Sequence, residues 1–207
     1  MEYISLGSNC SITYQLSKLG LRTNTYPFDW CKITLQQLIQ ILEENFNDYV
    51  ESLKFVSISN LHPIFEFDLK LGNELKQELR MYEIQSTNSL ILTNKYNIRY
   101  AHELGEKYQL EEFKNKMKER VARFRELKNN DICFVRIELS PLNQSWHSNI
   151  MKLHSLLCSY SSNFKLILII CSQIEFQFPP NIKIYRFDEF DPDWKMDTLD
   201  WNDIFSL

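Results

Sequence analysis

Glycine is scarce in this chain, with four among 207 residues, and histidine is equally rare. So few glycines supply neither a GxGxxG nor a GxxxxGK[ST] loop, which excludes the common nucleotide-cofactor and NTPase sites. HExxH is absent too, and the histidines lack the spacing of metal ligands. We therefore expect no metal in the site.

An excess of basic charge is also lacking, since the net charge is −4 and the isoelectric point is near 5.6. Nucleic-acid binders normally carry a basic patch, so we expect no nucleic-acid partner. Basic residues gather between Lys114 and Lys128, but glutamates alternate with them. This pattern is typical of a solvated helix with i,i+4 ion pairs.

The five cysteines are an odd number and form no CxxC pair. This argues against a disulfide framework and favours a reducing compartment, so we expect a cytoplasmic protein, in the host cytoplasm if the source is viral. No signal peptide is expected before the first strand. The longest apolar run, Leu166 to Cys171, is too short to cross a bilayer, so no membrane span is expected.

Apolar periodicity predicts strands and helices that alternate along one domain, residues 1–207. Strands are expected at 2–6, 131–138, 164–171 and 182–187, and helices at 10–19, 34–46, 110–127 and 146–160. Continuous apolar strands separated by helices predict a three-layer α/β fold, with a mostly parallel sheet and helices on both faces.

Two segments are harder to interpret. Residues 55–99 contain extended runs at 64–67 and 90–93 and a possible helix at 73–82, in no clear order. The acidic, aromatic tail, residues 188–207, is expected to dock on the surface as a closing segment.

Cys10 is the most informative residue, because it ends the run Ser5-Leu6-Gly7-Ser8-Asn9 and opens a helix. A helix terminus directs unsatisfied N–H groups and the positive end of the helix dipole at the sulfur, which lowers a thiol pKa. Cys10 is therefore a candidate nucleophile. A small buried apolar residue is the alternative.

A thiol nucleophile needs a base, and His102 is the best-placed histidine, between an extended segment and the long helix. His154 is expected to pack, and His147 and His62 are expected at the surface or in a loop. Spacing does not identify the carboxylate that would orient the base. Asp29, Glu103 and Glu138 all qualify.

The oxyanion formed by attack on a carbonyl needs donors, for which the backbone N–H of Cys10 and the Asn9 side chain are candidates. Asn9 also suits a plain turn residue. Arg136, in an otherwise apolar strand, requires a partner, either Asp29 or a ligand phosphate or carboxylate.

Ser5 to Cys10 and Tyr26-Pro27-Phe28-Asp29-Trp30 together resemble the papain-like cysteine peptidase family whose members carry SLGxxC and PFDW motifs. His102, the run Phe134-Val135-Arg136 and a tail with Trp194 and Trp201 follow in the same order. This family is in turn similar to capsular-polysaccharide acetyltransferases that bind coenzyme A. In one respect the chain departs from papain, whose histidine belongs to a β-rich domain, whereas strands and helices are expected to alternate here.

The resemblance implies thiol-dependent acyl transfer. The leading hypothesis is that Cys10, with His102 as base and Asp29 orienting it, passes an acetyl group from acetyl-coenzyme A to a sugar or sugar nucleotide. Gly7 and Asn9 would serve the oxyanion and Trp30 the substrate, while Arg136 or Arg22 would meet phosphates.

Two alternatives stay open. A cysteine peptidase or amidase would use the same residues with water as the final acceptor. A non-catalytic binding module would simply pack Cys10.

Overall fold

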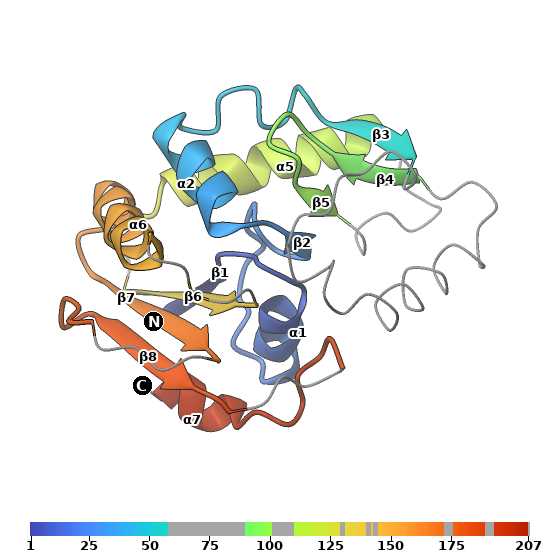
Figure 1. The fold of residues 1–207 in the computed structure, drawn as a ribbon. Helices are drawn as coiled ribbons and strands as arrows, with labels where there is room; N and C mark the ends of the chain where they lie inside the picture. Colours follow the sequence, from blue (N-terminus) through green and yellow to red (C-terminus); the bar gives the residue numbers. More distant parts are fainter. Residues whose placement is uncertain are drawn as a thin grey trace.

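A four-stranded parallel sheet, sheet A, forms the centre of the computed structural model, which describes residues 1–57, 90–100, 110–128, 131–139, 142, 145–171, 176–188 and 193–206. Its strands are β1 (Glu2–Ser5), β6 (Ile132–Glu138), β7 (Phe164–Ile170) and β8 (Ile182–Arg186), adjacent in that order (Figure 1). β6 is buried along its whole length and β7 nearly so, as their apolar sequences predict.

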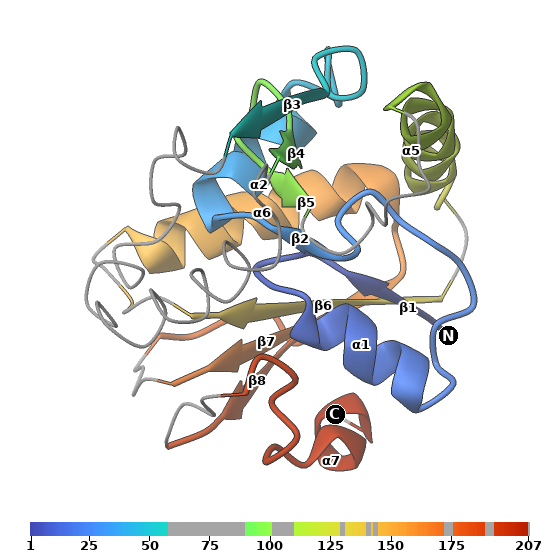
Figure 2. The same cartoon turned by 90° about the vertical axis from the view of Figure 1, so that its right-hand side faces the viewer.

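Helices cover both faces of sheet A, as Figure 2 shows. One face packs against α1 (Ser11–Lys18) and α7 (Trp201–Ser206), through a cluster that includes Ile12 and Ile204. The other face packs against α2 (Leu35–Glu43), α5 (Leu110–Arg125) and α6 (Trp146–Tyr160). The predicted three-layer α/β fold with a parallel sheet is confirmed.

Local signals explain where several helices begin and end. Thr34 and Gln37 form a capping box at the start of α2, in which each side chain accepts from the other residue's backbone N–H. After α1 the chain turns at Gly20, whose φ of +69° is the left-handed conformation that favours glycine. On α5, Lys116 and Glu112 form one of the expected i,i+4 ion pairs, at 2.9 Å.

A second, antiparallel sheet, sheet B, was not foreseen. It contains β2 (Cys31–Lys32), β5 (Arg99–Tyr100), β4 (Leu90–Thr93) and β3 (Lys54–Ser57), adjacent in that order. β2 and β5 have two residues each, too few to show a period. The predicted extended run at 90–93 is β4, whereas the predicted extended run at 64–67 and the possible helix at 73–82 lie outside the described residues.

The Tyr49 hydroxyl ties sheet B to the PFDW segment. It donates to the Pro27 carbonyl at 2.9 Å and lies 2.5 Å from the Tyr100 hydroxyl, with all three groups in the interior. Cys31 of β2 pairs with Tyr100 of β5 in the same region. The PFDW segment is therefore held from both sides.

The tail closes over the outer face of α1 and β1. Gln15 Nε2 of α1 donates to the Lys195 carbonyl at 2.8 Å, and the Tyr3 hydroxyl of β1 donates to the Phe205 carbonyl at 3.0 Å. Trp201 and Phe205 are buried there. The tail thus docks as predicted, and the expectation of one domain over residues 1–207 stays a prediction.

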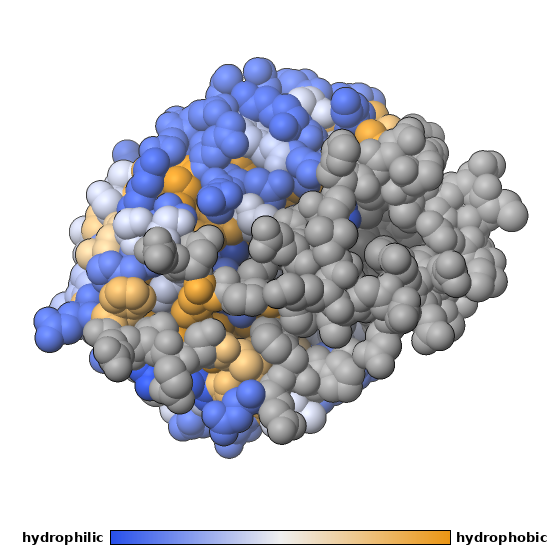
Figure 3. All heavy atoms as spheres, viewed as in Figure 1, coloured by the Kyte–Doolittle hydropathy of each residue, from blue (hydrophilic) through white to orange (hydrophobic). Residues whose placement is uncertain are grey.

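The surface over α2 and the loop towards β3 is mostly hydrophilic (Figure 3). Within the described ranges, no helix combines the length and apolar character needed to cross a membrane. All five cysteines are free thiols.

Candidate active site

Cys10 occupies the position just before α1, where its carbonyl accepts from the Tyr14 N–H at 3.0 Å. The turn that carries it follows β1, at the carboxyl end of parallel sheet A, where sites of α/β proteins gather. The residue is 6% exposed. The strand-turn-helix context predicted for this thiol is therefore present.

The turn itself is tightly packed against β2. Gly7 has a φ of +74°, and a Cβ placed on it would lie 2.3 Å from Ile33 Cγ2 and 3.4 Å from Cys31 Sγ. Contact at 2.3 Å leaves no room for a side chain. Glycine is thus required at this position both by conformation and by space.

Ser8, the next residue, has a φ of +87°, which a non-glycine residue adopts only at a cost. Its hydroxyl is buried and has no hydrogen-bond partner among the described residues. Both features cost free energy, and their coincidence two residues before Cys10 is typical of a functional turn. No sequence signal marked Ser8.

The Asn9 side chain caps α1. Its Oδ1 accepts from the Ser11 N–H at 3.1 Å and also from the Ser11 hydroxyl. Because a backbone N–H must meet an oxygen, these bonds fix the amide orientation and leave Nδ2 as the outward donor. No described residue accepts a hydrogen bond from Nδ2. Asn9 therefore acts as a turn residue, which was one of the two expectations. Its Nδ2 still has a hydrogen to donate to an oxyanion, which was the other.

Arg136 anchors the turn from the neighbouring strand, with no exposed surface. Its Nε donates to Glu138 Oε1 at 2.6 Å, one Nη to the Leu6 carbonyl at 3.1 Å and the other to the Ile33 carbonyl at 3.4 Å. The guanidinium therefore joins β6, the end of β1 and the end of β2. Complete burial argues against the predicted contact between Arg136 and a ligand phosphate.

Asp29 pairs with Arg22 instead of Arg136, so the suggested Asp29–Arg136 pair is wrong. Its Oδ2 accepts from Arg22 at 2.8 and 3.2 Å and from the Tyr26 N–H at 2.9 Å. Burial raises the pKa of Asp29 above its usual value, and the nearby Arg22 charge offsets part of this effect. In this position Asp29 stabilises its own loop through hydrogen bonds from Arg22 and from the Tyr26 N–H.

Thr13 connects that loop to α1. Its hydroxyl accepts from the Trp30 N–H at 3.3 Å and approaches Asp29 Oδ1 at 3.5 Å. Thr13 follows Cys10 by three residues and so shares its side of the helix. Trp30, half-buried with a φ of +56°, is thereby held one helical turn from the thiol.

His102, the predicted base, lies outside the described residues, as do His62 and Glu103. Two other histidines are described. His154 contacts Asn181 Oδ1 at 3.0 Å and packs against the Phe164 ring, as expected of a packing residue. His147 stacks on Phe176 at the start of α6, with its ring nitrogen 3.3 Å from the Gln177 carbonyl.

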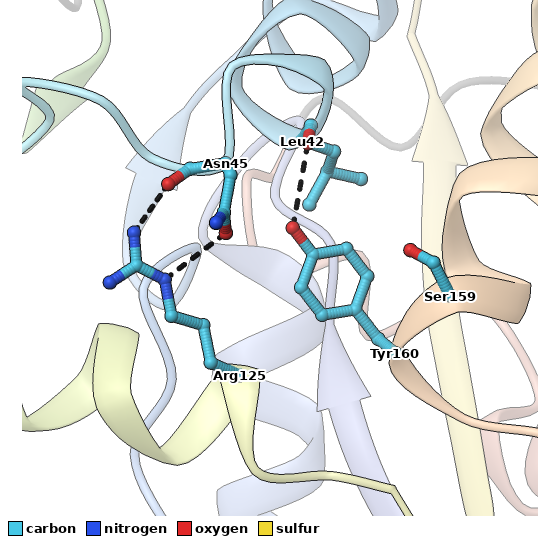
Figure 4. A pocket seen from close by; sticks show the side chains of 5 residues that line it. All are labelled: Leu42, Asn45, Arg125, Ser159 and Tyr160. Atoms are coloured by element: carbon cyan, nitrogen blue, oxygen red, sulfur yellow. Dashed lines mark hydrogen bonds between the residues drawn. The ribbon is translucent and has the colours of Figure 1, made fainter.

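A hollow of about 330 Å³ opens elsewhere, between the last turns of α2, α5 and α6 (Figure 4). Arg125 extends from α5 to the carbonyl and side-chain oxygens of Asn45, and the Tyr160 hydroxyl lies 3.5 Å from the Leu42 carbonyl. Helix ends carry partial negative charge, which a guanidinium stabilises. Ser159 completes the lining. We assign the hollow a structural role.

Comparison with known proteins identifies the class of protein. Residues 1–174 match the family described as "Putative papain-like cysteine peptidase (DUF1796)", so the chain belongs to that family and the predicted resemblance is confirmed.

Among individual proteins, the chain is similar to "Uncharacterized protein R408" of Acanthamoeba polyphaga mimivirus. The two are 30% identical over 225 residues, covering 98% of this chain and 96% of the relative. No solved structure matches.

Gly7→Ala tests the tight packing of the turn, with Gly20→Ala as its matched control. Both residues have a positive φ, but a Cβ on Gly20 would meet nothing within 4 Å. We expect Gly20→Ala to lower the free energy of unfolding by about 1 kcal/mol and Gly7→Ala by about 3 kcal/mol or more, measured by urea denaturation. Equal losses would contradict the clash with Ile33.

Asp29→Asn tests the buried carboxyl group through the pH dependence of stability. Because the folded-state pKa exceeds the usual 3.8, the contribution of Asp29 is greatest below that pH and falls as pH rises through the folded-state pKa. The free energy of unfolding of the natural protein, relative to that of the Asp29→Asn variant, should therefore decrease as the pH rises above about 4. Urea denaturation across pH 4 to 8 measures this; a relative stability that rises with pH would contradict it.

Proposed function

We propose that the protein is a cysteine enzyme that forms a thioester between Cys10 and an acyl group. One observation carries the proposal: Cys10 lies at the start of α1, on a strained turn anchored by Arg136, next to the Asn9 amide that Ser11 holds through Oδ1. If Cys10 were only a packed side chain, the positive φ at Ser8 would not be needed. Family membership independently favours a thiol enzyme.

In the first step, the base takes the proton of the Cys10 thiol, and the thiolate attacks the carbonyl carbon of the acyl donor. The carbonyl electron pair moves to oxygen, where Asn9 Nδ2 and backbone N–H groups stabilise the negative charge. When that pair returns, the leaving group departs with the proton and the acyl group stays on sulfur.

His102 is the base in this proposal. Tyr100, two residues earlier, pairs with Cys31, which borders Gly7. Two residues span at most about 7 Å, so the chain enters the histidine segment from beside the turn that carries Cys10. The position of Tyr100, the last described residue before His102, supports His102 over His147 and His154, which have other contacts on α6.

Acetyl transfer is the first outcome that we propose for the thioester. Acetyl-coenzyme A is the donor, and a sugar or sugar-nucleotide hydroxyl attacks the thioester while its proton passes to the base. Arg22 and Trp30, which are partly accessible beside α1, would contact the donor or the acceptor.

Hydrolysis is the second outcome, and the family description favours it. A peptide or amide would acylate Cys10, and water would replace the sugar hydroxyl as acceptor. The two outcomes share every residue and differ only in what enters after acylation.

Selective alkylation tests the nucleophile. We expect iodoacetamide below neutral pH to label Cys10 first, because a helix terminus and a base favour its thiolate. The other thiols are internal controls: Cys158 is exposed, and burial raises the pKa of Cys133 to about 12. Mass mapping that finds Cys158 labelled before Cys10 would favour the packed-cysteine alternative.

Coenzyme A separates the two enzymatic outcomes. A transferase should be stabilised against heating by coenzyme A, by about 3 kcal/mol at a hundredfold excess over Kd, whereas a peptidase should be indifferent. Acetyl-coenzyme A should also acetylate Cys10 in the natural protein and not in the Cys10→Ser variant, as intact mass would show. If coenzyme A does not stabilise the protein and acetyl-coenzyme A does not acetylate Cys10, acetyl transfer is rejected and hydrolysis remains.

A further inference from the structure

Glu138 has an unusual environment for a carboxylate at the end of a buried strand. Its Oε1 accepts the 2.6 Å hydrogen bond from the fully buried Arg136, which fixes the side chain. No described residue donates to its second oxygen, Oε2. The side chain keeps 9% of its surface exposed.

Asp29 differs in each of these respects. Its Oδ2 already accepts three hydrogen bonds, its Oδ1 faces the Thr13 hydroxyl, and its side chain is 4% exposed. A carboxylate occupied by its own loop has little capacity left for an imidazole. Glu138 has that capacity, with one oxygen held and one available.

Strand register brings Glu138 to the turn that carries Cys10. β1 and β6 are parallel, with Ser5 opposite Val135, and Arg136 bonds to the Leu6 carbonyl just before Gly7. Glu138 ends β6 at the same edge of the sheet from which that turn departs. The carboxylate and the thiol therefore belong to neighbouring strand ends.

We propose that Glu138, and not Asp29, is the carboxylate that orients the catalytic imidazole of the Cys10 site, and that Arg136 is its positioning residue. This inference rests on the proposed function. Oε2 accepts the N–H of the imidazole and stabilises the imidazolium formed when the thiol loses its proton. Among the described residues, Arg136 is the charged group that contacts Glu138.

The test must separate this role from the structural one, because Glu138→Gln alone leaves a buried guanidinium without its anion. The matched pair is the natural protein and the double variant Arg136→Met with Glu138→Gln, with Asp29→Asn as the control. The double variant removes both charges of the ion pair, and replacing a buried ion pair by uncharged groups is often tolerated. Acetyl release from p-nitrophenyl acetate and the pH profile of Cys10 alkylation by iodoacetamide are measured for each.

We expect the double variant to release acetyl groups at least about tenfold more slowly than the natural protein. Its alkylation profile should move to higher pH by about half a unit or more, because the imidazolium loses its counter-charge. A purely structural role would lower stability without moving that profile. Equal rates and profiles in the pair, or a shift produced by Asp29→Asn instead, would overturn the assignment.

The natural protein distinguishes the two possible failures. Selective labelling of Cys10 with no difference within the pair rejects Glu138 alone. Absence of selective labelling in the natural protein rejects the proposed function and the Glu138 assignment together.

Discussion

The buried guanidinium of Arg136 is the constraint on which the candidate site depends. Removing a cation from water costs several kcal/mol, about the whole stability margin of a domain, so its partners must be present in the folded state. Glu138 balances the charge, and the Leu6 and Ile33 carbonyls each accept one hydrogen bond from the guanidinium. Satisfying one side chain therefore fixes three chain segments relative to one another.

Strain accumulates around this anchor. Gly7 and Ser8 both have a positive φ, and Trp30 adopts another in the loop that Thr13 holds against α1. Such conformations persist when the surroundings over-determine them, here through Arg136 in the first turn and through the linkage from Thr13 to Asp29 in the second. The segments Ser5 to Cys10 and Tyr26 to Trp30 thus contain two strained turns held against one helix.

The architecture separates catalytic resemblance from fold resemblance. The family description refers to papain, yet the centre of this protein is a four-stranded parallel sheet between helices, with a small antiparallel sheet on one side. The same thiol chemistry recurs on unrelated folds, because it requires a nucleophile, a base and oxyanion donors rather than one architecture. The similarity to the mimivirus relative extends over 98% of this chain.

The sequence by itself determined the elements with a clear apolar period, which are the helices α5 and α6 and the strands of sheet A. It also placed the Cys10 thiol at the start of α1. Apolar periodicity and helix caps involve residues that are close in sequence, so they can be recognised from the sequence alone. Tertiary structure alone decided the two-residue strands β2 and β5 and the contacts of Arg136 with the Leu6 and Ile33 carbonyls, both of which are distant in sequence. A charged side chain records its need for a partner in its residue type, but which partner it meets depends on contacts between segments distant in sequence, and only the folded chain brings these together.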